Sequence, residues 1–285
     1  MTTFFGREAR LVVARKGDKT GFDLSELDLA FDIRKNLKAK PNVGKITIWN
    51  MAPAPRKILE TSDAVTVEIY AGYTGAMGLL YSGEMRAAVT AQDQGEYTTV
   101  IQTADKASTF AHAAIRTPMG PGSTVADAIK ACAKALGDVT GTPVGTGAID
   151  KALARLSGKA NKVLFPHGGA LSGRAASQMT ALCAGAGLEW SVQDGAIQIL
   201  GIGDPDDSTA VELGPSTGMV GNPSVSHKGY VKATSLLNPR LRCGRKIVFD
   251  NSNGLQGAYR IEEVRYEGDR AKQAWYAHIE AGVVT

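Results

Sequence analysis

Apolar and polar residues alternate over several short stretches in residues 1–105, which is typical of β-strands with one buried face. In the clearest stretch, 27–33, Leu27, Leu29, Phe31 and Ile33 share one face and two aspartates point the other way. Further strands are predicted at 45–49, 64–70 and 97–103, with turns at 40–44 and 52–55. Short strands with one apolar face cannot stay an open sheet in water, so the region predicts a small barrel or sandwich.

After the proline- and glycine-rich stretch 117–122, the apolar spacing becomes helical. Thr124 and Asp127 fit a capping box with Asp in the Glu position, which predicts a helix that ends at Gly137. The stripe expected to face inward in that helix is Val125, Ile129, Cys132 and Leu136. Two further helices are predicted at 148–156, with Ile149, Leu153 and Leu156 inward, and after Ser172, with Ala176, Met179, Cys183 and Ala186 inward and an end at Gly185 or Gly187.

A hairpin follows the last of these helices. Residues 188–193 and 196–200 are two alternating runs joined by Asp194-Gly195, a strong two-residue turn signal. The stretch 201–207 is typical of a linker, and β structure resumes at Thr209, with strands around 246–250 and 275–281. Between 259 and 266 the apolar phase slips, which a β-bulge would accommodate. We therefore predict a β-rich α+β chain with β regions at 1–105 and 204–285 and an α+β domain at 106–203.

Composition changes this picture little. The 285 residues are 44% hydrophobic and 21% charged, as in ordinary globular proteins, and the net charge is +4. No run approaches the ~20 apolar residues of a membrane span, and the start lacks the features of a secretory signal, so a soluble protein made in a cytoplasm is expected. Three widely separated cysteines, without a CxxC, predict buried structural thiols.

The densest basic cluster is Arg240, Arg242, Arg245 and Lys246, beside a predicted strand. A duplex-DNA reader normally concentrates positive charge on one stripe or arm. A solvated strand end or a protein interface explains this cluster at least as well as phosphate binding.

Motifs for catalysis are weak. Residues 214–218 fit G-x-S-x-G around Ser216, but a nucleophile elbow needs a following helix, and the sequence after it disfavours one. His167-Gly168-Gly169 more simply makes a turn. The four histidines show no metal-ligand spacing, and no acidic pair has the arrangement of a glycosidase. We therefore predict no enzyme activity, catalytic residue, cofactor or metal.

Several segments resemble the baseplate central hub proteins of contractile-tailed phages, of the T-even and Mu-like kind. Residues 237–244 match Leu-x-Pro-x-Leu-x-x-Gly before a strand, and 257–269 match Gly-x-Tyr-Arg-Ile-x-x-Val-x-x-x-Gly-Asp. The hairpin at 188–200, the helical unit that starts at Ser172-Gly173 and the N-terminal stretch 22–35 are similar to them too. The motifs are degenerate and diagnostic only together. At 285 residues the chain is short for the T-even hub, and these residues contain no repetitive spike segment like that of the type VI fusions.

The resemblance implies two β-barrel domains of the tail-tube type flanking the α+β domain. It implies a homotrimeric, pseudo-sixfold ring that joins the tail tube to the central spike around the channel for DNA and the tape-measure protein. Tube, spike, baseplate wedge and tape-measure proteins would be its partners, with DNA only as passing cargo. The expected location is the baseplate of the virion tail, assembled in the host bacterial cytoplasm.

We expect the turn around Asn238 to lie near a subunit contact. The candidate interface residues are Leu236, Asn238, Pro239, Arg240 and Leu241. Three alternatives stay open: a hexameric distal tail or tube-adaptor protein, a tail-associated hydrolase that uses Ser216, and a host-binding module. Only 18 aromatic residues occur, most of them on predicted core faces, which argues mildly against the last.

Overall fold

The computed structural model describes residues 4–15, 21–61, 65–93, 95–105, 112–140, 153–154, 162–227, 229–250, 255 and 257–284. Its tertiary contacts divide the chain into two compact units. One, here called the sheet unit, comprises Met1–Asn36, Asn42–Asp105 and Pro205–Thr285. The other, the mixed unit, comprises Leu37–Pro41 and Lys106–Asp204.

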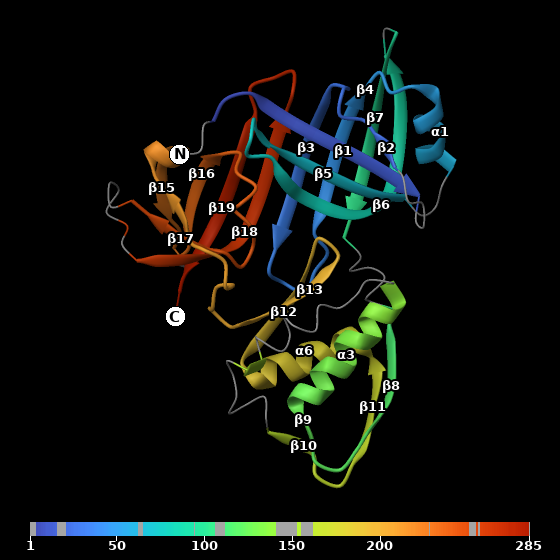
Figure 1. The fold of residues 1–285 in the computed structure, drawn as a ribbon, viewed down its shortest axis with the longest axis vertical. Helices are drawn as coiled ribbons and strands as arrows, with labels where there is room; N and C mark the ends of the chain where they lie inside the picture. Colours follow the sequence, from blue (N-terminus) through green and yellow to red (C-terminus); the bar gives the residue numbers. More distant parts are fainter. Residues whose placement is uncertain are drawn as a thin grey trace. The chain divides into compact units, whose positions relative to one another are not determined.

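The sheet unit is built on thirteen described strands in one sheet (Figure 1). The strands are β1 (Arg7–Arg15), β2 (Phe22–Asp23), β3 (Leu29–Asn36), β4 (Val43–Trp49), β5 (Val65–Tyr73), β6 (Gly78–Asp93), β7 (Glu96–Ala104), β14 (Val211–Leu213), β15 (Met219–Val225), β16 (Val231–Leu236), β17 (Lys246–Phe249), β18 (Ala258–Asp269) and β19 (Trp275–Val283). Their order is β15-β16-β19-β18-β3-β4-β7-β6-β5-β1-β2, with β17 beside β18 and β14 beside β17.

The N-terminal and C-terminal β regions share this sheet, because β3 pairs antiparallel with β18 from Ala30 opposite Asp269 to Asn36 opposite Glu263. Within the described part of the chain the strand path is open, with β15 and β2 at its ends, and it does not close into a barrel. The expected β-rich fold is confirmed. The arrangement as two separate barrels, and the boundaries at 105 and 203, stay predictions.

Most strands lie where the alternation predicts them, as β4, β5 and β7 show. The first predicted strand was placed two residues early, because Leu27 lies in a turn and β3 begins at Leu29. The turn predicted at 52–55 was wrong: helix α1 (Pro53–Thr61) begins there. Proline has no N–H to donate, but the first turn of a helix leaves its N–H groups unpaired anyway, so Pro53 and Pro55 start the helix.

The sheet folds over on itself, so that β1 and β5 cross over β3 and β4 (Figure 1). The core lies between these two layers. Trp275 on β19 is fully buried, and its indole N–H donates to the Gly72 carbonyl of β5 at 3.1 Å. Phe31 packs edge-on against the same indole, and the Arg7 guanidinium of β1 lies over it at 5.8 Å. One aromatic side chain thereby joins strands from both ends of the sequence.

The phase slip in 259–266 is confirmed as an irregularity of β18, whose register with β19 shifts between Ile261 and Glu263. The extra residue lets Tyr259 and Ile261 on one side of the shift, and Val264 and Tyr266 on the other, all be buried.

In its described residues the mixed unit contains the helices α3 and α6 and three antiparallel strand pairs. Its elements are β8 (Ala114–Met119), β9 (Ser123–Thr124), α3 (Val125–Thr140), β10 (Val163–Phe165), β11 (Gly169–Arg174), α6 (Ala175–Ala186), β12 (Leu188–Gln193) and β13 (Ala196–Gly201). β8 pairs with β11, β9 with β10 and β12 with β13. The β pattern does not stop at residue 117, because Pro118 lies inside β8.

The capping box of α3 is confirmed: the Asp127 carboxylate accepts from Thr124 N at 2.9 Å, and Asp127 N donates to Thr124 Oγ1 at 3.2 Å. The predicted stop at Gly137 was wrong, because α3 continues to Thr140. Gly137 is buried there, so packing offsets its weak helix propensity. α6 begins after Ser172, at Ala175, and ends before Gly187, which takes a left-handed conformation with φ 74°.

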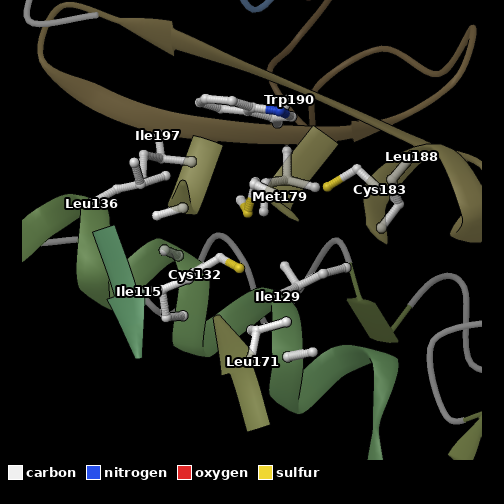
Figure 2. Packing of buried hydrophobic residues seen from close by; sticks show 14 of the residues in the cluster. Ile115, Ile129, Cys132, Leu136, Leu171, Met179, Cys183, Leu188, Trp190 and Ile197 are labelled. Carbon is white, nitrogen blue, oxygen red and sulfur yellow. The ribbon is translucent and has the colours of Figure 1, made fainter. Parts of the chain in front are cut away.

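The hairpin prediction is confirmed, with Gln193 opposite Ala196 and positive φ at both turn residues, Asp194 and Gly195. α3, α6 and this hairpin enclose an apolar core (Figure 2). Cys132 of α3 and Cys183 of α6 both point into this core, where they are free, buried thiols. The helix predicted at 148–156 lies outside the described residues except for 153–154, where Leu153 is buried. No helix in the described ranges has the length and apolar character needed to span a bilayer.

Candidate functional site

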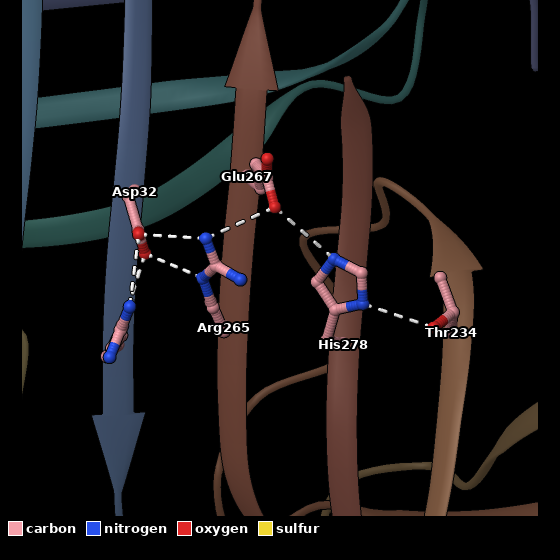
Figure 3. A network of polar contacts seen from close by, with 6 residues as sticks. Asp32, Thr234, Arg265, Glu267 and His278 are labelled. Carbon is pink, nitrogen blue, oxygen red and sulfur yellow. Dashed lines mark hydrogen bonds and ion pairs between the residues drawn. The ribbon is translucent and has the colours of Figure 1, made fainter. Parts of the chain in front are cut away.

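The solvent-facing side of the sheet carries a network of charged residues on four neighbouring strands, β3, β18, β19 and β16 (Figure 3). Asp32 of β3 accepts two hydrogen bonds from Arg265 of β18, each at 2.9 Å. Arg265 also lies 3.3 Å from Glu267, which lies 3.6 Å from Nε2 of His278 on β19. His278 Nδ1 and Thr234 Oγ1 of β16 are 3.1 Å apart. We call Asp32, Arg265, Glu267, His278 and Thr234 the charge network.

The strand register explains this connectivity. Asp32 is directly opposite Glu267, and Arg34 is directly opposite Arg265, so each facing pair carries like charges. Like charges at facing positions are destabilising. The Arg265 side chain reaches diagonally and lies between the two carboxylates, which offsets their repulsion.

Asp32 and Arg265 form a pair of matched charges at the centre of the network. Burial acts to raise the pKa of Asp32, but hydrogen bonds and charges from Arg265 and Arg34 outweigh it, and the net pKa lies below the usual value. The hydrogen bond to Asp32 raises the pKa of Arg265. Both groups are therefore ionised across the physiological range, as a fixed neutral pair.

An open hollow lies beside the network, where small residues of four strands or their flanking loops leave room. Its smaller lining residues are Ala30, Thr47, Gly268 and Ala274. Its charged lining residues are Lys45, Arg265, Lys272, Asp32, Glu267 and Asp269. Three positive and three negative groups balance there, so the hollow has no preference for an anion or a cation by net charge.

The structure separates the predicted contact residues onto two sides of the sheet. Leu236 is half-buried at the end of β16, in one cross-strand row with Tyr276, Glu267 and Asp32, so it faces the charge network's side. Leu241 is fully buried, and its carbonyl accepts from the Tyr266 hydroxyl at 2.6 Å. Because Tyr266 alternates with Arg265 and Glu267 along β18, Leu241 lies on the opposite, buried side.

The other three predicted contact residues form the turn between these positions. Asn238 Oδ1 accepts from Arg240 N at 3.0 Å, and the Asn238 carbonyl accepts from Leu241 N at 3.0 Å. Pro239 lies against Gly78 of β6, where an added Cβ would approach the proline ring at 2.9 Å. Arg240 is exposed. Of the five residues, Arg240 therefore offers the most accessible side chain, and a role in subunit contact stays a prediction.

The motifs considered for catalysis lie in plain turns. Ser216 lies in a single 3-10 turn, Pro215–Thr217, which the strand β15 follows in place of the helix that an elbow requires. His167 and Gly168 form the turn between β10 and β11. Among the described side chains, no three His, Cys, Asp or Glu come together as a metal ion would require.

Sequence reasoning missed the charge network. Asp32 and Arg265 are 233 positions apart, and no motif joins them. Each does occupy an outward position of an alternating strand, so the only signal was that both were charged and expected to face away from a core.

No family model matches the sequence, and no curated protein matches it. Among solved structures, the chain is similar to a tail protein from Neisseria meningitidis MC58, with a TM-score of 0.61 and 11% identity over 97% of this chain and 96% of that one. It is similar to a 43 kDa tail protein of prophage MuSo2 from Shewanella oneidensis, with a TM-score of 0.58 and 11% identity over 96% and 97% of the two chains.

A third similar structure is a component of the E. coli type VI secretion system, itself described as similar to the T4 bacteriophage tail proteins gp27 and gp5. The TM-score is 0.58 and the identity 14%, over 96% of this chain and 77% of that one. The resemblance noted in the sequence is confirmed at the level of fold. This chain has the fold of phage tail proteins.

Proposed function

We propose that this protein is a structural, non-enzymatic subunit of a phage-tail baseplate. The observation that carries the proposal is the extent of the structural similarity. It covers nearly the whole of this chain and nearly the whole of the two matched tail proteins. In the proposed assembly three copies form a pseudo-sixfold hub ring. Residues 1–105 and 204–285 of each copy serve as two tube-like halves, joined through β3 and β18.

Ring assembly gives a physical reason for the open sheet. A ring subunit needs complementary faces that close head to tail after a fixed number of copies. The strands β15 and β2, at the ends of the described strand path, leave two sheet edges for neighbouring subunits. Pro223 in β15 cannot donate to a ladder, which favours contact with a defined partner over indiscriminate strand pairing.

The side of the sheet that bears the charge network is the proposed channel wall. DNA that passes through a tail must not be held by its phosphates, and free arginines and lysines would hold it. Arg265 is already bound by Asp32 and Glu267 on this side, and Lys232 is paired with Glu280 at 3.6 Å. Paired charges of this kind are hydrated and weakly adhesive. The tail tube, central spike, wedge and tape-measure proteins are the proposed neighbours, and DNA is passing cargo.

The test is a cryo-EM reconstruction of tail particles that contain this chain, with its copies counted around the tail axis. Three copies, each with two tube-like halves in one ring, are expected. Six copies would overturn the hub assignment in favour of a distal tail or tube-adaptor protein. Tail particles without the chain would overturn the proposed location altogether.

A further inference from the structure

A rigid loop presents arginines on the side of β18 opposite to the charge network. This arginine loop, residues 238–245, lies between β16 and β17. The side chains of Leu241 and Cys243 point into the core and are 0% and 3% exposed. Those of Arg240 and Arg242, which alternate with them in the sequence, are exposed. The alternation fixes which side chains reach solvent.

The backbone of the loop is held in its middle and at its C-terminal end. Gly244 N donates to the Ile261 carbonyl at 2.8 Å, and Ile261 N donates to the Arg245 carbonyl at 3.0 Å. Tyr266 holds the Leu241 carbonyl at 2.6 Å. A surface ordered in this way pays little conformational entropy when a partner binds.

The three arginines of the loop form no ion pair with any residue that the structure describes, although Asp206 acts on Arg245 from a distance. The side chains of Arg240 and Arg242 make no hydrogen bond or ion pair with any described residue. Arg245 donates Nη1 to the Arg240 carbonyl at 3.2 Å, but its Nε is enclosed without a hydrogen-bond partner there. Burial first, and then the charges of Arg242 and Arg240, lower the pKa of Arg245, against the opposing influence of Asp206 and Tyr266.

We propose that the arginine loop is a docking surface for a carboxylate-bearing segment of a neighbouring tail protein. Guanidinium groups bind carboxylates through paired, charge-assisted hydrogen bonds, and a fixed loop sets the geometry for them. A negative partner would also relieve the mutual repulsion of the three arginines.

Protein is favoured over nucleic acid on two grounds. Three side chains on one short loop do not form the extended positive stripe of a nucleic-acid site. The loop also lies on the opposite side of β18 from the proposed channel wall, so passing DNA would not meet it. This second ground rests on the proposed function.

The test uses the full chain and two probes, poly-L-glutamate and a short DNA duplex, with binding followed by fluorescence anisotropy at low salt. The loop variant is Arg240→Gln/Arg242→Gln, and the matched control is Arg34→Gln/Lys45→Gln on the other side of the sheet. The loop variant should bind poly-L-glutamate at least about tenfold more weakly, and the control should differ less than about twofold.

Equal binding of poly-L-glutamate by the wild type and the loop variant would overturn the proposal, as would a loop-dependent preference for the duplex. The single variant Arg242→Gln, expected to bind about threefold more weakly, repeats the test if the double variant fails to fold. Because the assay needs no tail particle, its failure would leave the ring proposal standing, and a wrong copy number would leave the binding result standing.

Discussion

Arg265 in the charge network lies between two carboxylates, at 2.9 Å from Asp32 and 3.3 Å from Glu267. In the arginine loop, the side chains of Arg240 and Arg242 have no polar partner among the residues that the structure describes, and the charges of both lower the pKa of Arg245. The same side chain thus has two settings on opposite sides of one strand, β18. The first setting matches its charges within the chain. In the arginine loop the positive charge is left for another molecule to pair with. This difference distinguishes the proposed channel wall from the proposed docking surface.

The largest effect is expected when the buried anchor of the arginine loop, Leu241, is truncated. Leu241→Ala should lower the free energy of unfolding by about 3 kcal/mol, because the side chain is fully buried and leaves a cavity. Leu236→Ala, at a half-buried position just before the loop, should cost less than about 1 kcal/mol. Chemical denaturation checks both values. Equal costs would mean that Leu241 does not anchor the loop.

Cys243 reports on the same change by its rate of thiol labelling. Burial raises the pKa of Cys132 to about 11 and of Cys183 to about 12, so these two thiols should stay unreactive in the folded protein at pH 8. Leu241→Ala should therefore speed labelling at Cys243 and not at the other two, as peptide mapping would show.

A second test removes the arginine that separates the two carboxylates. Arg265→Gln leaves Asp32 facing Glu267 directly and should lower the free energy of unfolding by about 1 kcal/mol, a modest value because the side chains are partly exposed. Arg34→Gln is the control, since Arg34 is more exposed and its contacts with Asp32 are 3.3 Å and longer. A loss no larger than that of the control would show that the network is not matched in the way described.

The third test follows the network with pH. The folded-state pKa of Asp32 is lowered, so its stabilising contribution is present above the unfolded value of about 3.9 and is lost as pH falls through the folded value. The gap in unfolding free energy between the wild type and Asp32→Asn should be constant near pH 7 and shrink below about pH 4. The exposed Asp28→Asn serves as the reference. A gap that widened in acid would reverse the assignment.

The smallest effect on the free energy of unfolding is expected in the arginine loop. There an arginine-to-glutamine change should stabilise the protein slightly or leave it unchanged, whereas Arg265→Gln destabilises it. Arg242→Gln removes a charge that repels Arg245 and breaks no described contact. The unfolding free energy should rise or stay within about 0.5 kcal/mol of the wild type. Thermal melts at low salt, run beside Arg265→Gln, make the comparison direct. A clear loss of stability would mean that Arg242 already has a stabilising partner within the chain, which would contradict the proposed docking surface.

The sequence predicted the local elements well because their signals are local. The capping pair Thr124 and Asp127 and the turn Asp194-Gly195 are fixed by neighbouring residues, and both were confirmed. The start of α1 was missed because proline is common both in turns and in the first turn of a helix, so Pro53 and Pro55 do not distinguish the two.

The contents of the two surfaces could not be predicted in the same way. The pairing of Asp32 with Arg265 depends on β3 meeting β18, which is a property of the register between distant strands. The basic cluster at 240–246 was visible in the sequence, and an interface was one interpretation of it. Only the burial of Leu241 and Cys243 shows which of its side chains are fixed outward.

The most direct test of the account is the orientation of β18 in a cryo-EM map of the assembled tail. We expect Asp32, Arg265 and Glu267 to line the axial channel in a three-copy ring, and the arginine loop to lie against acidic side chains of a neighbouring protein away from the axis. A map with the arginine loop lining the channel, or with the charge network buried against another subunit, would contradict the account.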